Sequence, residues 1–201
     1  AIHGDIDPNE IEEKLLHATS DWEAPTPEIL LPDIMRLNEP SRKVAKTQKE
    51  QSVVTLSFQG ATLGQADQTV LDVISEALND MGSRLFLRIR EELGLAYYVG
   101  TQNFSGLMPG CFSFYAGTGA DTASQVEKEL IAQAKRLAKE GLTAEEINRA
   151  KAKLSGHKKI ARQELSQVAF SACMDELLGL GFMHSNEEET RVERVTLDEV
   201  K

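Results

Sequence analysis

The segment 51–58 alternates apolar and polar residues, and no other feature restricts the possible folds of this chain as strongly. Val54, Leu56 and Phe58 fall on one side of the segment, whereas the opposite side is more polar. Successive side chains of a β-strand point to opposite faces, so the pattern predicts a strand with one apolar face. That face must pack against another layer of the protein, and the following sequence supplies helices to form it.

Amphipathic helices and a β-hairpin follow this strand. In each helical segment the apolar residues recur every three or four positions, which places them on one side of a helix. The predicted helices span residues 67–78, 84–93, 121–138 and 143–178, with a break at Gly156, where glycine disfavours the helix; residues 187–201 begin another. The predicted hairpin strands are residues 96–104 and 111–116. This order indicates an α+β fold in which an antiparallel sheet has helices packed on one face.

The sequence before the first strand has a different character. Residues 1–22 read as the end of a preceding half-domain, with a strand end and then a helix that begins at Asp7 and Pro8. Four of the six prolines lie within residues 23–48. Because proline cannot donate a backbone hydrogen bond, this segment is interpreted as a linker. Residues 49–201 form the main α+β domain, which we expect to be truncated at its end because both ends of the chain look cut.

Charge and composition exclude several classes of function. The net charge is -10 and the isoelectric point is about 5.0, whereas binding to nucleic-acid phosphates needs a basic surface. No run of about 18 apolar residues occurs, so no membrane span is expected. Cys111 and Cys173 are too few for a disulfide framework, and we expect two buried or half-buried thiols. No targeting signal identifies a compartment.

One stretch combines several distinctive residues, because residues 83–99 read SRLFLRIREELGLAYYV. It resembles the C-terminal-half signature of the pitrilysin (insulinase-like) zinc metallopeptidases, a family that includes mitochondrial processing peptidase. Two flanking blocks agree with the family in order and spacing, GDIDP at residues 4–8 and GLTAEE at residues 141–146. The chain therefore resembles the C-terminal half-domain of such a peptidase over nearly its whole length.

The resemblance implies a role for Arg90 and Tyr97. In the family, an arginine and a tyrosine seven residues apart reach across to a zinc site in the other half of the protein. Arg90 and Tyr97 occupy these positions here, and the adjacent Tyr98 is the alternative to Tyr97. A guanidinium and a phenol are suitable donors to the negative charge that builds on a carbonyl oxygen during peptide hydrolysis. Without the resemblance, a solvated arginine and a half-buried tyrosine would explain both residues.

No zinc site is expected within this chain. The family's zinc motif is HxxEH on a helix, and the four histidines here are far apart in sequence. They are His3, His17, His157 and His184. The resemblance implies that the upstream half of the parent protein supplies zinc and the catalytic base. The present half would close the cleavage chamber and contact a peptide or unfolded polypeptide substrate.

The leading hypothesis is a non-catalytic C-terminal half of a zinc-dependent metalloendopeptidase, inactive on its own. It is expected to pair with the upstream catalytic half-domain and to form a homodimer or heterodimer, without nucleic acid or a membrane span. The alternative is a structural or companion subunit of a peptidase-like complex that has lost catalysis. A third interpretation, an unrelated α+β binding domain, requires the ordered sequence blocks to be coincidental. An HxxEH motif upstream would separate the first two hypotheses.

Overall fold

The computed structural model describes residues 1–23 and 38–201, and the chain divides into two compact units. The first unit comprises residues 1–33 and 159–185, and the second comprises residues 34–158 and 186–201. Much of the expected linker falls on residues 24–37, which lie outside the described residues. Among the described helices, none combines the length and the apolar character that crossing a bilayer requires.

Among its described residues, the first unit contains the helices α1 (Pro8–Ala18) and α6 (Leu165–Leu177). The predicted start of α1 is confirmed, because the Asp7 side chain accepts a hydrogen bond from the backbone N–H of Asn9 at 2.9 Å. This bond satisfies one of the N–H groups that a helix leaves free at its start. The strand end expected before Asp7 is wrong, since no strand is assigned there.

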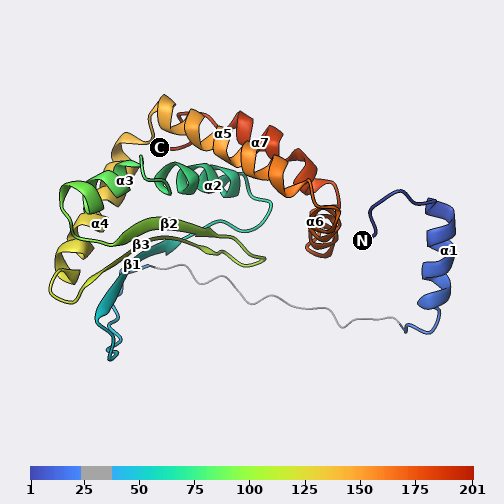
Figure 1. The fold of residues 1–201 in the computed structure, drawn as a ribbon, viewed down its shortest axis with the longest axis horizontal. Helices are drawn as coiled ribbons and strands as arrows, with labels where there is room; N and C mark the ends of the chain where they lie inside the picture. The colour runs from blue at the N-terminus through green and yellow to red at the C-terminus, as the bar shows by residue number, and fades with distance from the viewer. Residues whose placement is uncertain (24–37) are drawn as a thin grey trace. The chain divides into compact units, whose positions relative to one another are not determined.

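The second unit is built on a three-stranded antiparallel sheet, in agreement with the predicted fold class (Figure 1). Its strands are β1 (Gln51–Gln59), β2 (Tyr98–Phe104) and β3 (Cys111–Gly119), and β3 lies in the middle. Strands β2 and β3 form the predicted hairpin, with Tyr98 opposite Gly117. The helices of this unit are α2 (Ala66–Leu78), α3 (Arg84–Phe86), the π-helix η1 (Leu87–Glu92), α4 (Ala123–Glu140), α5 (Ala144–Ala161) and α7 (Glu188–Arg194). A short 3-10 helix, η2 (His184–Glu187), precedes α7.

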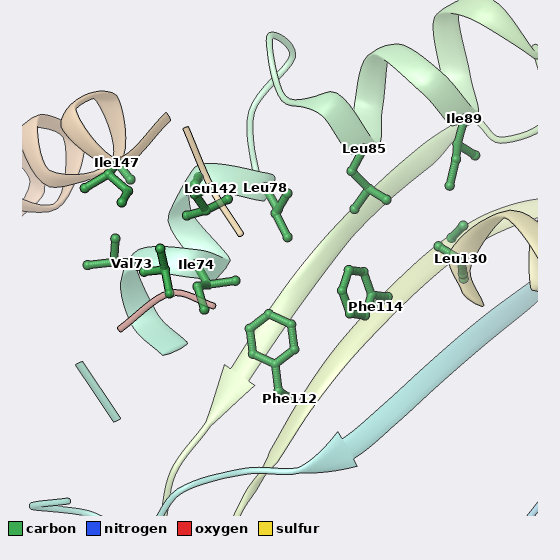
Figure 2. Packing of buried hydrophobic residues seen from close by; sticks show 14 of the residues in the cluster. Val73, Ile74, Leu78, Leu85, Ile89, Phe112, Phe114, Leu130, Leu142 and Ile147 are labelled. Atoms are coloured by element: carbon green, nitrogen blue, oxygen red, sulfur yellow. The ribbon is translucent and has the colours of Figure 1, made fainter. Parts of the chain in front are cut away.

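One face of the sheet forms the core with helices α2 and α4. Phe112 and Phe114 of β3 project from this face, and their rings meet edge to face with centroids 5.5 Å apart. Ile74 from α2 and Leu130 from α4 belong to the same cluster (Figure 2). Burial of each side chain of this kind stabilises a fold by about 1.5–3 kcal/mol. The alternation in 51–58 predicted a strand with one apolar face that packs against another layer. This prediction is confirmed, because Val54 and Leu56 of β1 pack against this cluster.

Two helix boundaries differ from the sequence-based expectation. Helix α5 continues through Gly156 and ends only at Ala161. A single glycine costs a helix about 1 kcal/mol, and burial of Ile147 and Ala150 anchors α5 against the core. The predicted long helix from 143 to 178 therefore breaks later than expected, between α5 and α6. Helix α7 ends at Arg194, so the helix expected over 187–201 is shorter than predicted.

The outer face of the sheet carries a reciprocal pair of tyrosines and glycines. A Cβ atom at Gly117 would overlap the ring of Tyr98, and one at Gly100 would meet the hydroxyl of Tyr115. Each ring thus uses the space above a glycine on the neighbouring strand, and the two ring centroids lie 6.2 Å apart. These close approaches explain why glycine occupies both positions, because any larger residue would displace a ring.

The expectation of two buried or half-buried thiols is wrong. Cys111 and Cys173 are both exposed and neither forms a disulfide. Cys111 begins β3 and stands opposite Gln59 and Phe104 at the end of the sheet, away from the buried cluster. Cysteine is common in cores because it behaves as a small apolar residue, but the register of β3 turns this one outward.

Candidate functional site

A capped helical segment positions Arg90. The buried Ser83 begins it, and its hydroxyl accepts a hydrogen bond from the backbone N–H of Phe86 at 3.1 Å. The segment continues as α3 and then as the π-helix η1, in which the N–H of Leu93 bonds to the carbonyl of Arg88, five residues earlier. It ends at Gly94, whose φ of 60° is a conformation that glycine adopts without strain.

The π-helical turn changes where the side chains of this segment point. A π-helix widens the backbone by bonding each N–H to the fifth residue before it, and such turns are frequent at functional sites. Leu85 and Ile89 remain fully buried on the core side of the segment. Arg90 emerges at the border, with its side chain 40% exposed.

The guanidinium of Arg90 lies against two aromatic rings. Its central carbon is 4.8 Å from the ring centroid of Phe86 and 5.6 Å from that of Tyr97. Both distances fall within the range of a cation–π interaction. The nearest carboxylate is the neighbouring Glu91, with an oxygen 3.8 Å from Nε of Arg90. The two rings therefore restrict the guanidinium while leaving part of it open to solvent.

Tyr97, and not Tyr98, is the tyrosine that lies beside Arg90. The backbone N–H of Tyr97 donates to the carbonyl of Gly117 at 2.9 Å, which fixes this residue at the start of β2. Its side chain is 72% exposed. The ring of Tyr98 instead lies over Gly117 on the outer face of the sheet. The structure thus brings together the two residues that the sequence singled out, at the junction of η1 and β2.

A second arginine on the same segment behaves differently. The Nη1 atom of Arg88 lies 2.8 Å from a carboxylate oxygen of Glu92, and its Nε lies 3.5 Å from Glu129 on α4. The hydrogen bond that Arg88 donates to Glu92 raises the pKa of Arg88, and the nearby charge of Glu129 adds to this effect. Arg88 therefore pairs with two carboxylates, whereas the guanidinium of Arg90 lies against two aromatic rings.

An ion pair that the sequence analysis missed anchors the start of the segment. The guanidinium of Arg84 makes two hydrogen bonds to the carboxylate of Glu146 on α5, one of them from Nε at 2.7 Å. Glu146 also accepts from the backbone N–H of Thr143 at 2.8 Å, and the Thr143 hydroxyl accepts from the N–H of Glu146. These two reciprocal bonds form a capping box at the start of α5. The pair joins the SRLF block to the GLTAEE block, which are 62 residues apart in sequence.

The environment of Glu146 favours its charged form. Burial raises the pKa of this carboxyl, but the hydrogen bonds from Arg84 and from Thr143 outweigh burial and leave the pKa below its ordinary value of 4.5. The side chains of Arg84 and Glu146 are only 14% and 11% exposed. The sequence contains one signal of this arrangement, since Thr143 and Glu146 have the spacing of a capping box. The ion-pair partner of Glu146 could not be identified without the fold.

The described residues do not fit a zinc site. Within 1–23 and 38–201, no group of three His, Cys, Asp or Glu side chains gathers closely enough to hold a metal ion. His157 is exposed on α5. The candidate site therefore consists of hydrogen-bond donors and aromatic rings.

An apolar cavity lies elsewhere in the second unit. It has a volume of about 510 Å³ and lies between the end of β1, helix α2 and helix α4. Phe58, Leu71 and Leu137 are among its lining residues, and neither Arg90 nor Tyr97 reaches it. The cavity and the candidate site are therefore separate features.

Comparison with known proteins identifies the family. The family model of the peptidase M16 inactive domain matches residues 1–154, which include every residue of the candidate site. An uncharacterized zinc protease of Rickettsia bellii is 37% identical over 120 residues, which cover 58% of this chain and 29% of that protein. An uncharacterized zinc protease of Bacillus subtilis is 32% identical over 112 residues, covering 55% of this chain and 27% of that protein. The chain thus spans less than a third of these curated relatives.

Solved structures share the fold. A protease from Helicobacter pylori superposes with a TM-score of 0.80 at 19% identity, over 98% of this chain and 49% of that one. A peptidase M16 inactive domain from Pseudomonas fluorescens superposes with a TM-score of 0.68 at 19% identity, over 76% of this chain and 37% of that one. The sequence blocks, the fold and the family model agree. The chain belongs to the M16 family of pitrilysin-like zinc proteases, in which it corresponds to the inactive domain.

Proposed function

We propose that this domain contacts the peptide substrate of a zinc-dependent endopeptidase and closes its cleavage chamber. The metal and the catalytic base would come from another part of a longer polypeptide, because the described residues bring no three potential ligands together. The observation that carries the proposal is the adjacency of Arg90 and Tyr97. The central guanidinium carbon of Arg90 lies 5.6 Å from the ring centroid of Tyr97, and Tyr97 is exposed.

The two residues supply complementary hydrogen-bond donors. A guanidinium offers several N–H groups in one plane, and a phenol offers one O–H group. Both are suited to a peptide carbonyl oxygen that gains negative charge as its bond is cleaved. Because Phe86 and Tyr97 both contact the guanidinium, Arg90 would lose little further freedom when it binds. A donor that is already ordered stabilises a developing charge better than one that must reorganise.

The proposal includes partners. The domain would pack against the catalytic half-domain that carries zinc, and an extended or unfolded polypeptide would lie between them. A homodimer or a heterodimer with a second peptidase-like chain would complete the assembly. The curated relatives named zinc proteases support this assignment, since they are more than three times longer than the stretch they share with this chain.

The test uses the longer protein and a reporter peptide. Arg90→Ala and Tyr97→Phe are each expected to lower kcat/KM by roughly tenfold or more, which corresponds to about 1.4 kcal/mol of transition-state stabilisation. Arg88→Ala is the matched control, because it removes an arginine two residues earlier whose partners are Glu92 and Glu129. This variant should retain nearly full activity.

Two results would contradict the proposal. If Arg88→Ala lowers kcat/KM as much as Arg90→Ala, the loss reflects disturbance of η1 and not removal of a substrate contact. If the wild-type longer protein cleaves no peptide but stimulates cleavage by a second chain, the domain belongs to a companion subunit.

A further inference from the structure

A short loop sets the position of Tyr97 relative to Arg90. Residues 93–97 lead from the end of η1 to the start of β2, so Arg90 precedes the loop and Tyr97 is its last residue. Because the side chain of Tyr97 is largely exposed, its position depends mainly on the backbone that carries it. The hydrogen bonds of this loop therefore determine how the two side chains meet.

The first half of the loop is bonded to the segment that carries Arg90. The backbone N–H of Gly94 donates to the carbonyl of Arg90 at 3.1 Å, and the N–H of Leu95 donates to the carbonyl of Ile89 at 3.0 Å. The side chain of Leu95 is buried in the core cluster. Up to the N–H of Leu95, the loop is thus fixed to η1.

The second half of the loop is bonded to β3. The hydroxyl of Thr118 donates to the backbone carbonyl of Leu95, and the carbonyl of Gly117 accepts from the N–H of Tyr97 at 2.9 Å. Leu95 therefore links the two elements, since its N–H bonds to η1 and its carbonyl bonds to a side chain of β3. The bond from Thr118 involves a side chain, so a substitution can remove it and leave the backbone unchanged.

A hydroxyl at position 118 departs from the pattern of β3. Side chains of a strand alternate between its two faces, and Phe112, Phe114 and Ala116 precede Thr118 on the buried face. Thr118 is itself only 5% exposed. Valine has nearly the same shape and suits an apolar face better, because a buried hydroxyl costs free energy unless it forms a hydrogen bond. The bond to Leu95 accounts for the threonine.

A second hydroxyl restricts the side chain of Thr118. A carbonyl oxygen only accepts, so the single proton of the Thr118 hydroxyl points to Leu95. The hydroxyl of Thr122 lies 2.7 Å from that of Thr118, and within this contact Thr122 is therefore the donor. The Thr122 hydroxyl also has the carbonyl of Gly119 within reach at 3.2 Å. Because Thr122 is the residue before α4, this contact connects the start of α4 to the loop.

We propose that Thr118 is a positioning residue, which sets the placement of Tyr97 beside Arg90 through its hydrogen bond to the carbonyl of Leu95. This role rests on the proposed contact of Arg90 and Tyr97 with substrate. Without the bond, the peptide group after Leu95 can rotate, and the ring of Tyr97 moves relative to the guanidinium 5.6 Å away. A displacement of about 1 Å is enough to slow a reaction that depends on aligned groups.

The first test measures the geometry in the 201-residue chain and needs no activity. The guanidinium of Arg90 lies against two aromatic rings, so ring currents shift the NMR signal of its Nε–H group. Thr118→Val should move this signal part of the way toward that of a free arginine, because the contact with Phe86 persists. Thr118→Ser keeps the hydroxyl and should leave the signal in place.

Thr101→Val is the matched control for both tests. Thr101 lies on the neighbouring strand β2, is 2% exposed, and donates its hydroxyl to the backbone carbonyl of Ser75. Its replacement removes the same kind of buried hydrogen bond at a position that does not contact the loop of residues 93–97. The Arg90 signal and the activity should both stay unchanged in this variant.

The second test measures cleavage of the reporter peptide by the longer protein. Thr118→Val should lower kcat by roughly three- to tenfold with a smaller change in KM, because a displaced donor acts mainly on the transition state. Thr118→Ser should retain nearly full activity. In a Tyr97→Phe background, which lacks the phenol O–H, Thr118→Val should cause almost no further loss.

Each test has results that would overturn the proposal. An Arg90 signal that Thr118→Val leaves in place does so whatever the activity, and so does an equal shift in Thr101→Val. A full further loss of kcat in the Tyr97→Phe background would show that Thr118 acts by another route. If the wild-type longer protein cleaves no peptide, the proposed function fails, and the Arg90 signal alone decides whether Thr118 positions the two residues.

Discussion

Replacement of Glu146 by alanine is expected to lower the free energy of unfolding by about 3 kcal/mol or more. The change removes the counter-charge of Arg84 and leaves a guanidinium that is only 14% exposed without its carboxylate. It also removes the side chain that accepts from the Thr143 N–H, so the first turn of α5 loses its cap. Breaking one member of a buried pair costs more than the pair contributes, because the remaining charge stays desolvated.

Urea unfolding followed by circular dichroism measures this effect. Glu145→Ala is the control, because it removes the preceding glutamate, whose side chain is 89% exposed and whose partner Arg149 lies at 3.7 Å. Exposed pairs of this kind contribute at most about 0.5 kcal/mol. Equal losses in the two variants would show that helix propensity, and not the Arg84–Glu146 pair, determines the effect.

The same pair predicts a dependence of stability on pH. The pKa of Glu146 in the folded protein lies below its ordinary value of 4.5, so its charged form stabilises the fold. This contribution is fully present above pH 4.5 and is lost as the pH falls through the folded-state pKa. The stability difference between wild type and Glu146→Gln should therefore shrink below pH 4.5 and stay constant above it. A difference that grows on acidification would contradict the assignment.

Replacement of Leu85 by alanine is expected to destabilise the protein by about 2–5 kcal/mol. Leu85 is completely buried and belongs to the cluster between the helices and the sheet (Figure 2). Its truncation removes apolar contacts and leaves a cavity that close-packed neighbours fill only in part. Because Leu85 lies in the first turn of the segment that carries Arg90, such a cavity would also loosen the support of the candidate site.

Leu87 provides a control within the same helical segment. Its side chain is 43% exposed, so Leu87→Ala should change the free energy of unfolding by roughly 0.5 kcal/mol. The two variants remove the same atoms at positions two residues apart. If both cost the same, packing against the core is not what holds this segment in place.

The sequence predicted the sheet and most helices because their signals are local. Alternation in 51–58 identified β1, which ends one residue later at Gln59. The π-helix could not be predicted, since Leu85, Phe86, Ile89 and Leu93 fit an ordinary helical stripe equally well. At Gly156 the local signal was misleading. Glycine disfavours a helix and predicted a break there, but the packing of α5 overrides this propensity.

Less of the candidate site than of the fold could be predicted from the sequence. Arg90 and Tyr97 were selected through a resemblance, and their spacing alone would have indicated only a solvated arginine and a half-buried tyrosine. Their actual contact depends on the turn at Gly94, which leads the chain from η1 to β2. The Arg84–Glu146 pair depends on packing between segments 62 residues apart, for which a single sequence contains no direct signal.

The π-helical turn of η1 has a consequence for comparing this protein with its relatives. The direction of Arg90 depends on how many residues separate Ser83 from Gly94, because each residue rotates a helix by about 100°. We expect a homologue with one residue fewer before its arginine to form a regular α-helix there and to turn the arginine away from the tyrosine. Length conservation between these two landmarks is therefore a stricter criterion for an intact site than the presence of the arginine and the tyrosine.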